Sequence, residues 1–220
     1  MRFAAPVINT FFLISTPDPM NKFFVLLIVV LLSACDKSEP AFEKITPDAV
    51  ILAFGDSLTY GSGASKNSDY PAILGTLSSH EIINAGIPGE ISQQGLNRLP
   101  NLLDEYQPEL LILIHGGNDM LRRIPQQQTR DNLKQMIEEA GLRNIKVVLL
   151  GVPKFNLFLL SSAEFYQKVA DAQEVPIDLE TLPKILSTNS LKSDAIHPNN
   201  EGYRLLAENI YKLLVDSGAL

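Results

Sequence analysis

Three residues in two turns of the sequence have the side chains needed for nucleophilic chemistry. Ser57 directly follows the turn residue Asp56 at the end of an apolar run, and Asp194 precedes His197 by three residues. Histidine has an unperturbed pKa near neutral pH, so His197 could take the proton of the Ser57 hydroxyl while Asp194 orients the ring. Each pattern also fits a structural role, because aspartate and serine favour turns and helix caps, and an Asp-x-x-His pair is often only structural.

Two further turns could stabilise a negatively charged oxygen formed in such a reaction. Gly89 directly precedes a predicted helix, where a glycine N–H can approach a ligand closely and the helix N-terminus adds partial positive charge. Asn118, in the run Gly-Gly-Asn-Asp at 116–119, can present its side-chain NH₂ to the same cleft. We expect the neighbouring His115 to pack or to line the site. Four separate turns thus supply complementary parts of one site, which favours a shared chemistry over four unrelated structural turns.

Strands and helices must bring these turns together, and the chain from Ala49 onward alternates apolar runs with amphipathic segments. This alternation is typical of parallel βαβ units in an α/β fold. We expect a parallel sheet of five strands over residues 50–54, 81–84, 110–114, 146–150 and 175–179. We expect helices, the last of them starting with Pro198, over residues 70–79, 91–106, 127–141 and 198–215. In such sheets ligands bind beyond the carboxyl ends of the strands, which is where Ser57 and Asn118 would lie.

Composition and charge exclude several classes of function. The 220 residues carry a formal net charge of −7, which argues against a surface that binds nucleic-acid phosphates. A single cysteine, Cys35, allows no intrachain disulfide, and three histidines are too few for a Cys/His zinc site. The loop at 60–65 lacks the third glycine of a dinucleotide motif and the Gly-Lys-Ser/Thr ending of a phosphate loop, so we expect only a flexible connection there.

The N-terminal region has the layout of a targeting segment. Residues 23–32 are wholly apolar but only about half as long as a membrane-spanning helix, and Lys22 precedes them. The sequence Leu-Ser-Ala-Cys at 32–35 resembles a bacterial lipobox, so cleavage would leave Cys35 as a lipid-modified N-terminus. Asp36 resembles the signal that retains such lipoproteins in the inner membrane of Gram-negative bacteria. The alternative is an ordinary signal peptide in which the cysteine is incidental.

The four turns resemble, in order, the four sequence blocks of the SGNH (GDSL) hydrolase family. The matching residues are Gly-Asp-Ser-Leu at 55–58, Gly89, Gly-Gly-Asn-Asp at 116–119 and Asp-x-x-His at 194–197, and the resemblance covers roughly residues 49–216. The segment 84–129 is similar to the branch of the family formed by periplasmic enzymes of Gram-negative bacteria with thioesterase, protease and lysophospholipase activity. The resemblance implies a three-layer α/β/α, flavodoxin-like fold and a serine esterase that needs no metal or cofactor.

The resemblance also assigns roles to individual residues. It implies that Ser57 is the nucleophile and that Asp194 and His197 complete a catalytic triad. It further implies an oxyanion hole made of the Ser57 N–H, the Gly89 N–H and the Asn118 side chain.

These observations divide the chain into three parts. Residues 1–34 are the expected signal peptide, with Met20 as an alternative start that would leave residues 1–19 upstream of the protein. Residues 35–48 comprise the lipidated cysteine and a polar tether, and residues 49–220 form the SGNH hydrolase domain. We expect a monomer in the bacterial cell envelope, on the periplasmic side, held to the membrane by its lipid anchor.

The substrate expected from the sequence is a small carboxylic ester, such as an aryl ester, or a single-acyl lipid such as a lysophospholipid. Thioesters stay in doubt, because an enzyme outside the cytosol would meet no acyl-CoA. The apolar loop at 153–160 is either core or one wall of an acyl pocket. The pocket candidates are Ile87, Pro88, Phe155, Leu157 and Phe158.

Three other functions remain open at this point. An O-deacetylase acting on envelope carbohydrate would use the same fold, and a shallow polar cleft beside Ser57 would favour it. A non-catalytic envelope lipoprotein that binds a ligand would be expected to lack a member of the triad. A metallophosphoesterase using Asp56, Asp119 and Asp194 is weaker, because a two-metal site needs more histidines.

Overall fold

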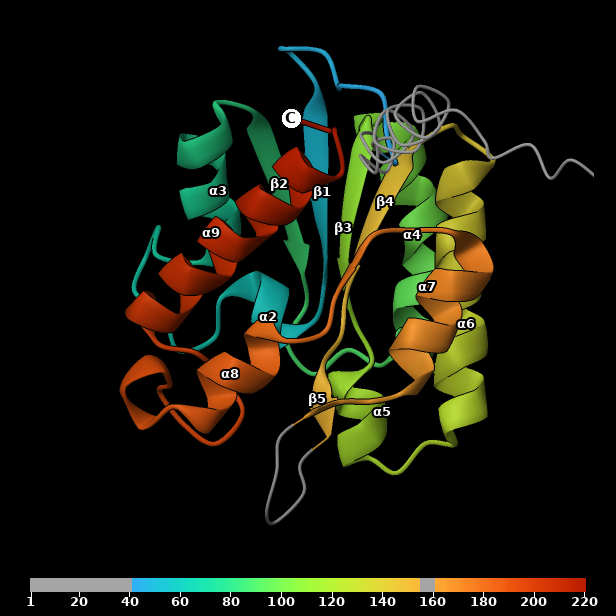
Figure 1. Cartoon of the computed structure of the whole chain (residues 1–220). Helices are drawn as coiled ribbons and strands as arrows, with labels where there is room; N and C mark the ends of the chain where they lie inside the picture. The colour runs from blue at the N-terminus through green and yellow to red at the C-terminus, as the bar shows by residue number, and fades with distance from the viewer. Residues whose placement is uncertain (1–40, 155–160) are drawn as a thin grey trace, which may run out of the picture. The chain divides into compact units, whose positions relative to one another are not determined.

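Five parallel strands form the centre of the computed structural model, which describes residues 41–154 and 161–220 (Figure 1). Their order in the sheet is β2-β1-β3-β4-β7, and every neighbouring pair is parallel. The strands are β1 (Val50–Gly55), β2 (Glu81–Gly86), β3 (Leu110–Ile114), β4 (Lys146–Leu150) and β7 (Ile177–Asp178). The predicted α/β fold with a five-stranded parallel sheet is therefore confirmed, although the fifth strand is shorter than the expected 175–179.

Helices cover both faces of this sheet, as expected for a three-layer α/β/α fold (Figure 1). On one face α3 (Tyr70–Ser78) packs against α9 (Asn200–Asp216). On the other face α4 (Ser92–Tyr106) packs against α6 (Gln126–Gly141), and α6 packs against α7 (Phe165–Gln173). The shorter elements are α2 (Ser57–Tyr60), α5 (Gly117–Leu121), α8 (Thr181–Ser187), the 3₁₀ helix η1 (Asn189–Leu191) and the antiparallel pair β5 (Pro153–Lys154) and β6 (Ser161–Ser162).

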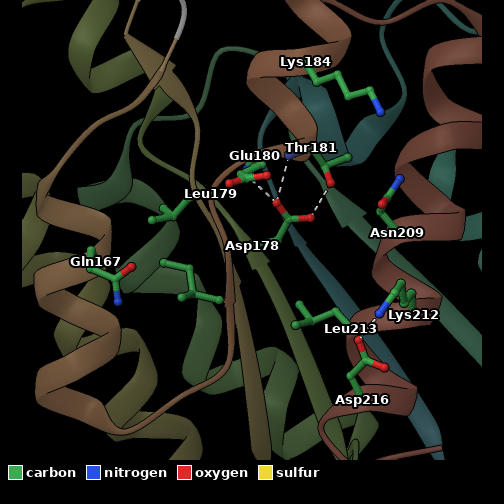
Figure 2. Close-up of a pocket in the computed structure, with 11 residues that line it drawn as sticks. Gln167, Asp178, Leu179, Glu180, Thr181, Lys184, Asn209, Lys212, Leu213 and Asp216 are labelled. Atoms are coloured by element: carbon green, nitrogen blue, oxygen red, sulfur yellow. Dashed lines mark hydrogen bonds and ion pairs between the residues drawn. The ribbon is translucent and has the colours of Figure 1, made fainter.

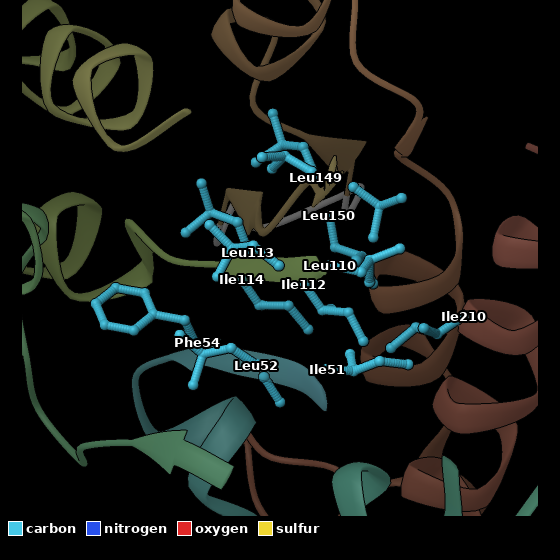
Figure 3. Packing of buried hydrophobic residues seen from close by; sticks show 14 of the residues in the cluster. Ile51, Leu52, Phe54, Leu110, Ile112, Leu113, Ile114, Leu149, Leu150 and Ile210 are labelled. Atoms are coloured by element: carbon cyan, nitrogen blue, oxygen red, sulfur yellow. The ribbon is translucent and has the colours of Figure 1, made fainter. Parts of the chain in front are cut away.

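The apolar runs of the sequence become the buried centre of the sheet (Figure 3). All five residues of β3 are buried, because both faces of this central strand are covered by helices. The register pairs Gly55 of β1 with Ile114 of β3, so these two strands end at the same edge. The turns that follow them, which carry Ser57 and Asn118, therefore begin side by side.

Three helix starts differ from the sequence prediction, and that of α6 differs by one residue, because this helix begins at Gln126 instead of 127. Helix α9 begins at Asn200 and not at Pro198, because Pro198 forms an antiparallel bridge with Lys192 and the side chain of Asn199 caps the helix by accepting from the N–H of Gly202 at 3.0 Å. Helix α4 begins at Ser92, so two residues separate it from Gly89.

The described chain begins at the end of the molecule opposite α2 and α5 (Figure 1). There the N–H of Phe42 donates to the carbonyl of Ser217 at 2.9 Å, and the N–H of Ile45 donates to the carbonyl of Ala219 at 3.0 Å. The expected signal peptide and Cys35 lie outside the described residues. Within the described ranges, no helix combines the length and the apolar character needed to cross a bilayer.

Candidate active site

Ser57 is the first residue of the four-residue helix α2, directly beyond the end of β1. Asp56 caps this helix, because its Oδ1 accepts from the N–H of Leu58 at 3.1 Å. The Asp56 carboxyl is buried, and burial raises its pKa despite the opposing effect of the hydrogen bond from the N–H of Leu58. The structural role considered for Asp56 therefore holds, and the cap fixes the backbone from which the half-buried Ser57 side chain projects.

His197 and Asp194 lie together in the loop before α9. The Nδ1 atom of His197 is 2.8 Å from Oδ2 of Asp194, and its Nε2 atom is 3.0 Å from Oγ of Ser57. Oδ1 of Asp194 accepts from the backbone N–H groups of Ile196 and His197, each at 2.8 Å. Burial raises the pKa of Asp194, but the hydrogen bonds from the His197 ring and from these two N–H groups outweigh it, so the pKa lies below its ordinary value.

This arrangement assigns the tautomer of His197. The ionised Asp194 is only an acceptor, so Nδ1 carries the proton and Nε2 is free to accept the hydroxyl hydrogen of Ser57. Such a chain of hydrogen bonds can raise the nucleophilicity of a serine.

The loop at 60–65, which was expected to be flexible, is tied to the start of α9. The hydroxyl of Tyr203 donates to the carbonyl of Ser62 at 2.9 Å, and the N–H of Ser65 donates to Oδ1 of Asn200 at 2.8 Å. These bonds link the segment after Ser57 to the segment after His197.

Asn118 faces the same region from α5. Its Nδ2 donates to Oδ2 of Asp56 at 3.1 Å and to the backbone carbonyl of Glu90 at 3.0 Å. Both partners are acceptors, which fixes the orientation of the amide with the NH₂ group toward them. Sequence reasoning did not reveal that both amide hydrogens already have protein partners.

Gly89 lies in the turn between β2 and α4 with a φ of +79°, a conformation that favours glycine. Its carbonyl accepts from Nη2 of Arg122 at 2.8 Å. The expected contribution of the helix N-terminus stays a prediction; the N–H of Ser92, the first residue of α4, donates to Asp119 at 2.8 Å. Within the part of the chain that the structure describes, neither the N–H of Gly89 nor that of Ser57 donates to another residue.

Two other candidates have structural partners. Asp119 is buried and accepts from the N–H and hydroxyl of Ser92 and from the hydroxyl of Thr129, so it links α4, α5 and α6. His115 is fully buried and bonded to Glu90, so it packs behind the site. Among the described residues, no cluster of histidine, cysteine and acidic side chains could hold a metal ion.

A hollow of about 20 Å³ adjoins Ser57 and Asn118. Part of its wall is apolar and comes from Leu58, Leu121, Val152 and Ile196. Sequence reasoning missed Leu121, Val152 and Ile196, although each lies within three residues of a motif or of a strand end. Ile87 is 46% exposed and Pro88 is also exposed, so both lie on the surface, whereas Phe155, Leu157 and Phe158 lie outside the described residues.

A wider cavity of about 440 Å³ lies beside β7, between α7 and α9, and does not include Ser57 (Figure 2). Its central carboxylate, Asp178, accepts from the N–H groups of Glu180 and Thr181, and Lys212 pairs with Asp216. These side chains stabilise local structure. The size of this cavity therefore does not mark it as the reaction site.

Residues 53–205 match the GDSL-like lipase/acylhydrolase family model. The thioesterase 1/protease 1/lysophospholipase L1 of Escherichia coli is 32% identical over 174 residues, which cover 74% of this chain and 82% of that protein. The esterase TesA of Pseudomonas aeruginosa is 33% identical over 201 residues, which cover 84% of this chain and 96% of that protein.

Among solved structures, a crystal structure of TesA superposes with a TM-score of 0.68 at 28% identity, covering 75% of this chain and 97% of the other. Residues 53–205, which the family model matches, include all four turns described above. The chain belongs to the GDSL-like lipase/acylhydrolase (SGNH) family and is a hydrolase of ester bonds.

Proposed function

We propose that the chain is a serine esterase that cleaves carboxylic esters through an acyl-enzyme intermediate, with Ser57, His197 and Asp194 as its triad. The observation that carries this proposal is the continuous chain of hydrogen bonds from Asp194 Oδ2 through the imidazole to Ser57 Oγ, at 2.8 and 3.0 Å. The Ser57 oxygen attacks the ester carbonyl carbon while its proton passes to His197 Nε2. The carboxylate of Asp194 stabilises the imidazolium that forms.

The carbonyl oxygen becomes an oxyanion in this step and needs donors. We assign this role to the N–H groups of Ser57 and Gly89 and to the Asn118 amide. Asn118 now donates one hydrogen to the neutral Glu90 carbonyl, and a full negative charge is a stronger acceptor. The oxyanion would therefore compete well for that hydrogen.

The imidazolium then protonates the leaving alcohol, which departs and leaves an acyl group on Ser57. Water attacks this ester with His197 again as the base, and the carboxylic acid is released. The bonds formed and broken balance without a metal ion or a cofactor.

The apolar wall of the hollow supports an ester with a hydrocarbon acyl group as substrate. The beginning of the acyl chain would contact Leu58, Val152 and Ile196, and a longer chain would extend over the exposed Leu121. Small esters, including aryl esters, and single-acyl lipids such as lysophospholipids fit this description. Lysophospholipase and thioesterase activity also appear in the name of the E. coli relative, and we extend only the former to this chain.

We further propose that the enzyme works as a monomer in the cell envelope, anchored on the periplasmic side by lipid on Cys35, with Asp36 favouring the inner membrane. The support is the lipobox-like sequence at 32–35. The anchor concentrates the enzyme at a bilayer, where single-acyl lipids are found.

The test is the Ser57→Ala variant, with the exposed Ser187→Ala on α8 as a matched control. Ser57→Ala should abolish hydrolysis of p-nitrophenyl butyrate and labelling by a fluorophosphonate while the protein stays folded. Ser187→Ala should keep both. Hydrolysis by Ser57→Ala would reject the nucleophile, and absence of both activity and labelling in the wild type would favour the ligand-binding lipoprotein.

A panel of substrates tests the ester class. It contains p-nitrophenyl esters of increasing acyl length, a lysophospholipid and an acetylated sugar. We expect the acyl esters and the lysophospholipid to be hydrolysed faster than the acetylated sugar. The reverse order would favour the carbohydrate O-deacetylase.

A further inference from the structure

A cluster of polar and charged side chains lies directly behind the proposed oxyanion donors. Glu90 is only 6% exposed, and its carboxylate accepts two hydrogen bonds from the guanidinium of Arg98, at 2.7 Å each. Nε2 of the fully buried His115 lies 3.1 Å from the same carboxylate. The N–H of Gly116 donates to Nδ1 of His115 at 2.9 Å, so the ring proton is on Nε2 and His115 is a neutral donor to Glu90.

This cluster contacts the ends of three neighbouring strands. Nη2 of Arg98 donates to the carbonyl of Ala85, near the end of β2, at 2.8 Å and to the carbonyl of Gly55, the last residue of β1, at 3.3 Å. The third strand, β3, is reached through His115. The backbone carbonyl of Glu90 in turn accepts from the Asn118 amide. One ion pair thus connects the turns that carry all the proposed oxyanion donors.

The surroundings leave little freedom for these side chains. The Arg98 guanidinium lies 4.1 Å from the centre of the Phe54 ring, in a cation–π contact. A Cβ atom added at Gly95 of α4 would lie 2.5 Å from Nε2 of His115, so only glycine leaves room for the imidazole there. Helix α4 carries Arg98 and leaves room for His115, so it holds these two side chains against the strand ends.

Stability alone is a weak reason for a pair in which Glu90 is buried and the Arg98 side chain is 22% exposed, because the cost of removing charges from water often cancels their attraction. Burial raises the pKa of Glu90, but the hydrogen bonds from His115 and Arg98 outweigh it, so the pKa lies below its ordinary value and the group is charged at neutral pH. An apolar pair could fill the same volume. It could not make directed hydrogen bonds to three strand ends.

We propose that Glu90 and Arg98 are positioning residues for ester hydrolysis, which hold the Gly89 N–H and the Asn118 amide at the distance that an oxyanion requires. They act through these donors and touch neither the substrate nor the reacting atoms. The inference rests on the proposed function, because it assumes that Gly89 and Asn118 stabilise the oxyanion. Donors misplaced by a fraction of an ångström would stabilise the transition state less while leaving substrate binding largely intact.

The experiment compares Glu90→Gln with Asp104→Asn. Both variants remove one carboxylate that pairs with an arginine, but the Asp104–Arg143 pair is exposed and joins α4 to the segment after α6, away from the site. We expect Glu90→Gln to lower kcat roughly ten- to a hundredfold with KM changed less than threefold. Asp104→Asn should keep kcat within about twofold, because an exposed ion pair contributes little to the stability of the fold.

A double variant separates positioning from general damage. If Glu90 acts through the oxyanion donors, Glu90→Gln should cost a clearly smaller factor in kcat on the Asn118→Ala background than on the wild type. Each rate is divided by the fraction of Ser57 that a fluorophosphonate labels at completion. This gives kcat per active molecule, so misfolded protein does not lower the value. Arg98→Lys, which keeps the charge but loses the paired hydrogen bonds, carries the same test if Glu90→Gln is insoluble.

An unchanged kcat in Glu90→Gln, or an equal cost on both backgrounds, would overturn the inference. A loss that disappears after correction for labelled Ser57 would also overturn it, because the role would then be structural. If the proposed function itself were wrong, a fluorophosphonate would not label Ser57 in the wild type. That result distinguishes failure of the proposed function from failure of this inference.

Discussion

Nε2 of His197 lies 3.0 Å from Oγ of Ser57, although 140 positions of sequence separate the two residues. Ser57 is held by the end of β1, and His197 is held by the loop that leads into α9. Helix α9 packs on the sheet through the buried Leu206, Ile210 and Leu214. The distance between the two side chains therefore depends on how α9 packs on the sheet. A substitution that changes the functional group of one site side chain and leaves α9 unchanged can test the role of that group.

Replacement of Asp194 by asparagine tests the orientation of the histidine. An asparagine would direct its carbonyl oxygen toward the backbone N–H groups of Ile196 and His197, which leaves its NH₂ group facing Nδ1 of the ring. The ring would then carry its proton on Nε2 and could not accept from Ser57. We expect kcat to fall by a factor on the order of 10³ to 10⁴, measured with p-nitrophenyl butyrate.

The matched control is Asp171→Asn on α7, an exposed carboxylate that among the described residues is bonded to Gln167 alone, and this variant should keep full activity. A loss of less than tenfold in Asp194→Asn would contradict the assigned role.

Replacement of Asn118 by alanine tests the oxyanion donor. We expect a loss of about 100- to 1000-fold in kcat with little change in KM, because the donor is needed only when the carbonyl oxygen becomes charged. Asn209→Ala, in the distant cavity beside β7, removes a side-chain amide bonded to the Leu205 carbonyl and serves as the control. A cost below about threefold for Asn118→Ala would count against the role.

The long apolar strands and the motif turns could be predicted from the sequence for a simple physical reason. A central parallel strand such as β3 is buried on both faces, so it reads as a continuous apolar run, and the polar turn that follows it is easy to see. The start of α9 could not be predicted in the same way. Proline favours a first helical position in general, but here Pro198 forms an antiparallel bridge with Lys192 inside the same loop, and no turn or capping motif at 192–198 indicates this pairing.

The contact between Glu90 and His115 could not be predicted from the sequence either, because 25 positions separate these residues and neither belongs to a repeating pattern. The neighbouring donor Arg98 is eight positions from Glu90 and lies on a helix that starts between them. Buried polar clusters of this kind depend on which strand ends meet, so they become visible only once the sheet order is known.

From the lowered pKa of Glu90 we also predict that the wild type and Glu90→Gln differ in how much stability they lose in acid. Its pKa in the folded protein lies below the ordinary value of 4.5, so its stabilising effect is fully present above pH 4.5 and is lost as the pH falls through the folded value. The wild type should therefore lose more free energy of unfolding between pH 6 and pH 3.5 than Glu90→Gln does. Urea unfolding at the two pH values measures this, and equal losses in both proteins would show that the folded carboxylate is not held in its charged form.

The position of the tether predicts how an anchored enzyme meets its substrate. The chain enters the described domain at Phe42, which bonds to Ser217 just beyond the last turn of α9, whereas His197 precedes the first turn. The 17 residues of α9 span about 25 Å. Seven Cα–Cα steps join Cys35 to Phe42, and fully extended they also reach at most about 25 Å.

An anchor on Cys35 would therefore hold the site away from the bilayer, and the domain could turn its site toward the lipid only with its tether close to full extension. Insertion of fifteen Gly/Ser residues after Ser38 should raise turnover of a lysophospholipid carried in the same vesicles as the enzyme, because the longer tether lets the domain turn over. Turnover of soluble p-nitrophenyl butyrate should not change, since this ester reaches the site from water in either orientation. Equal turnover of the vesicle-borne lipid with both tethers would contradict the prediction, because the orientation of the anchored domain would then not limit access.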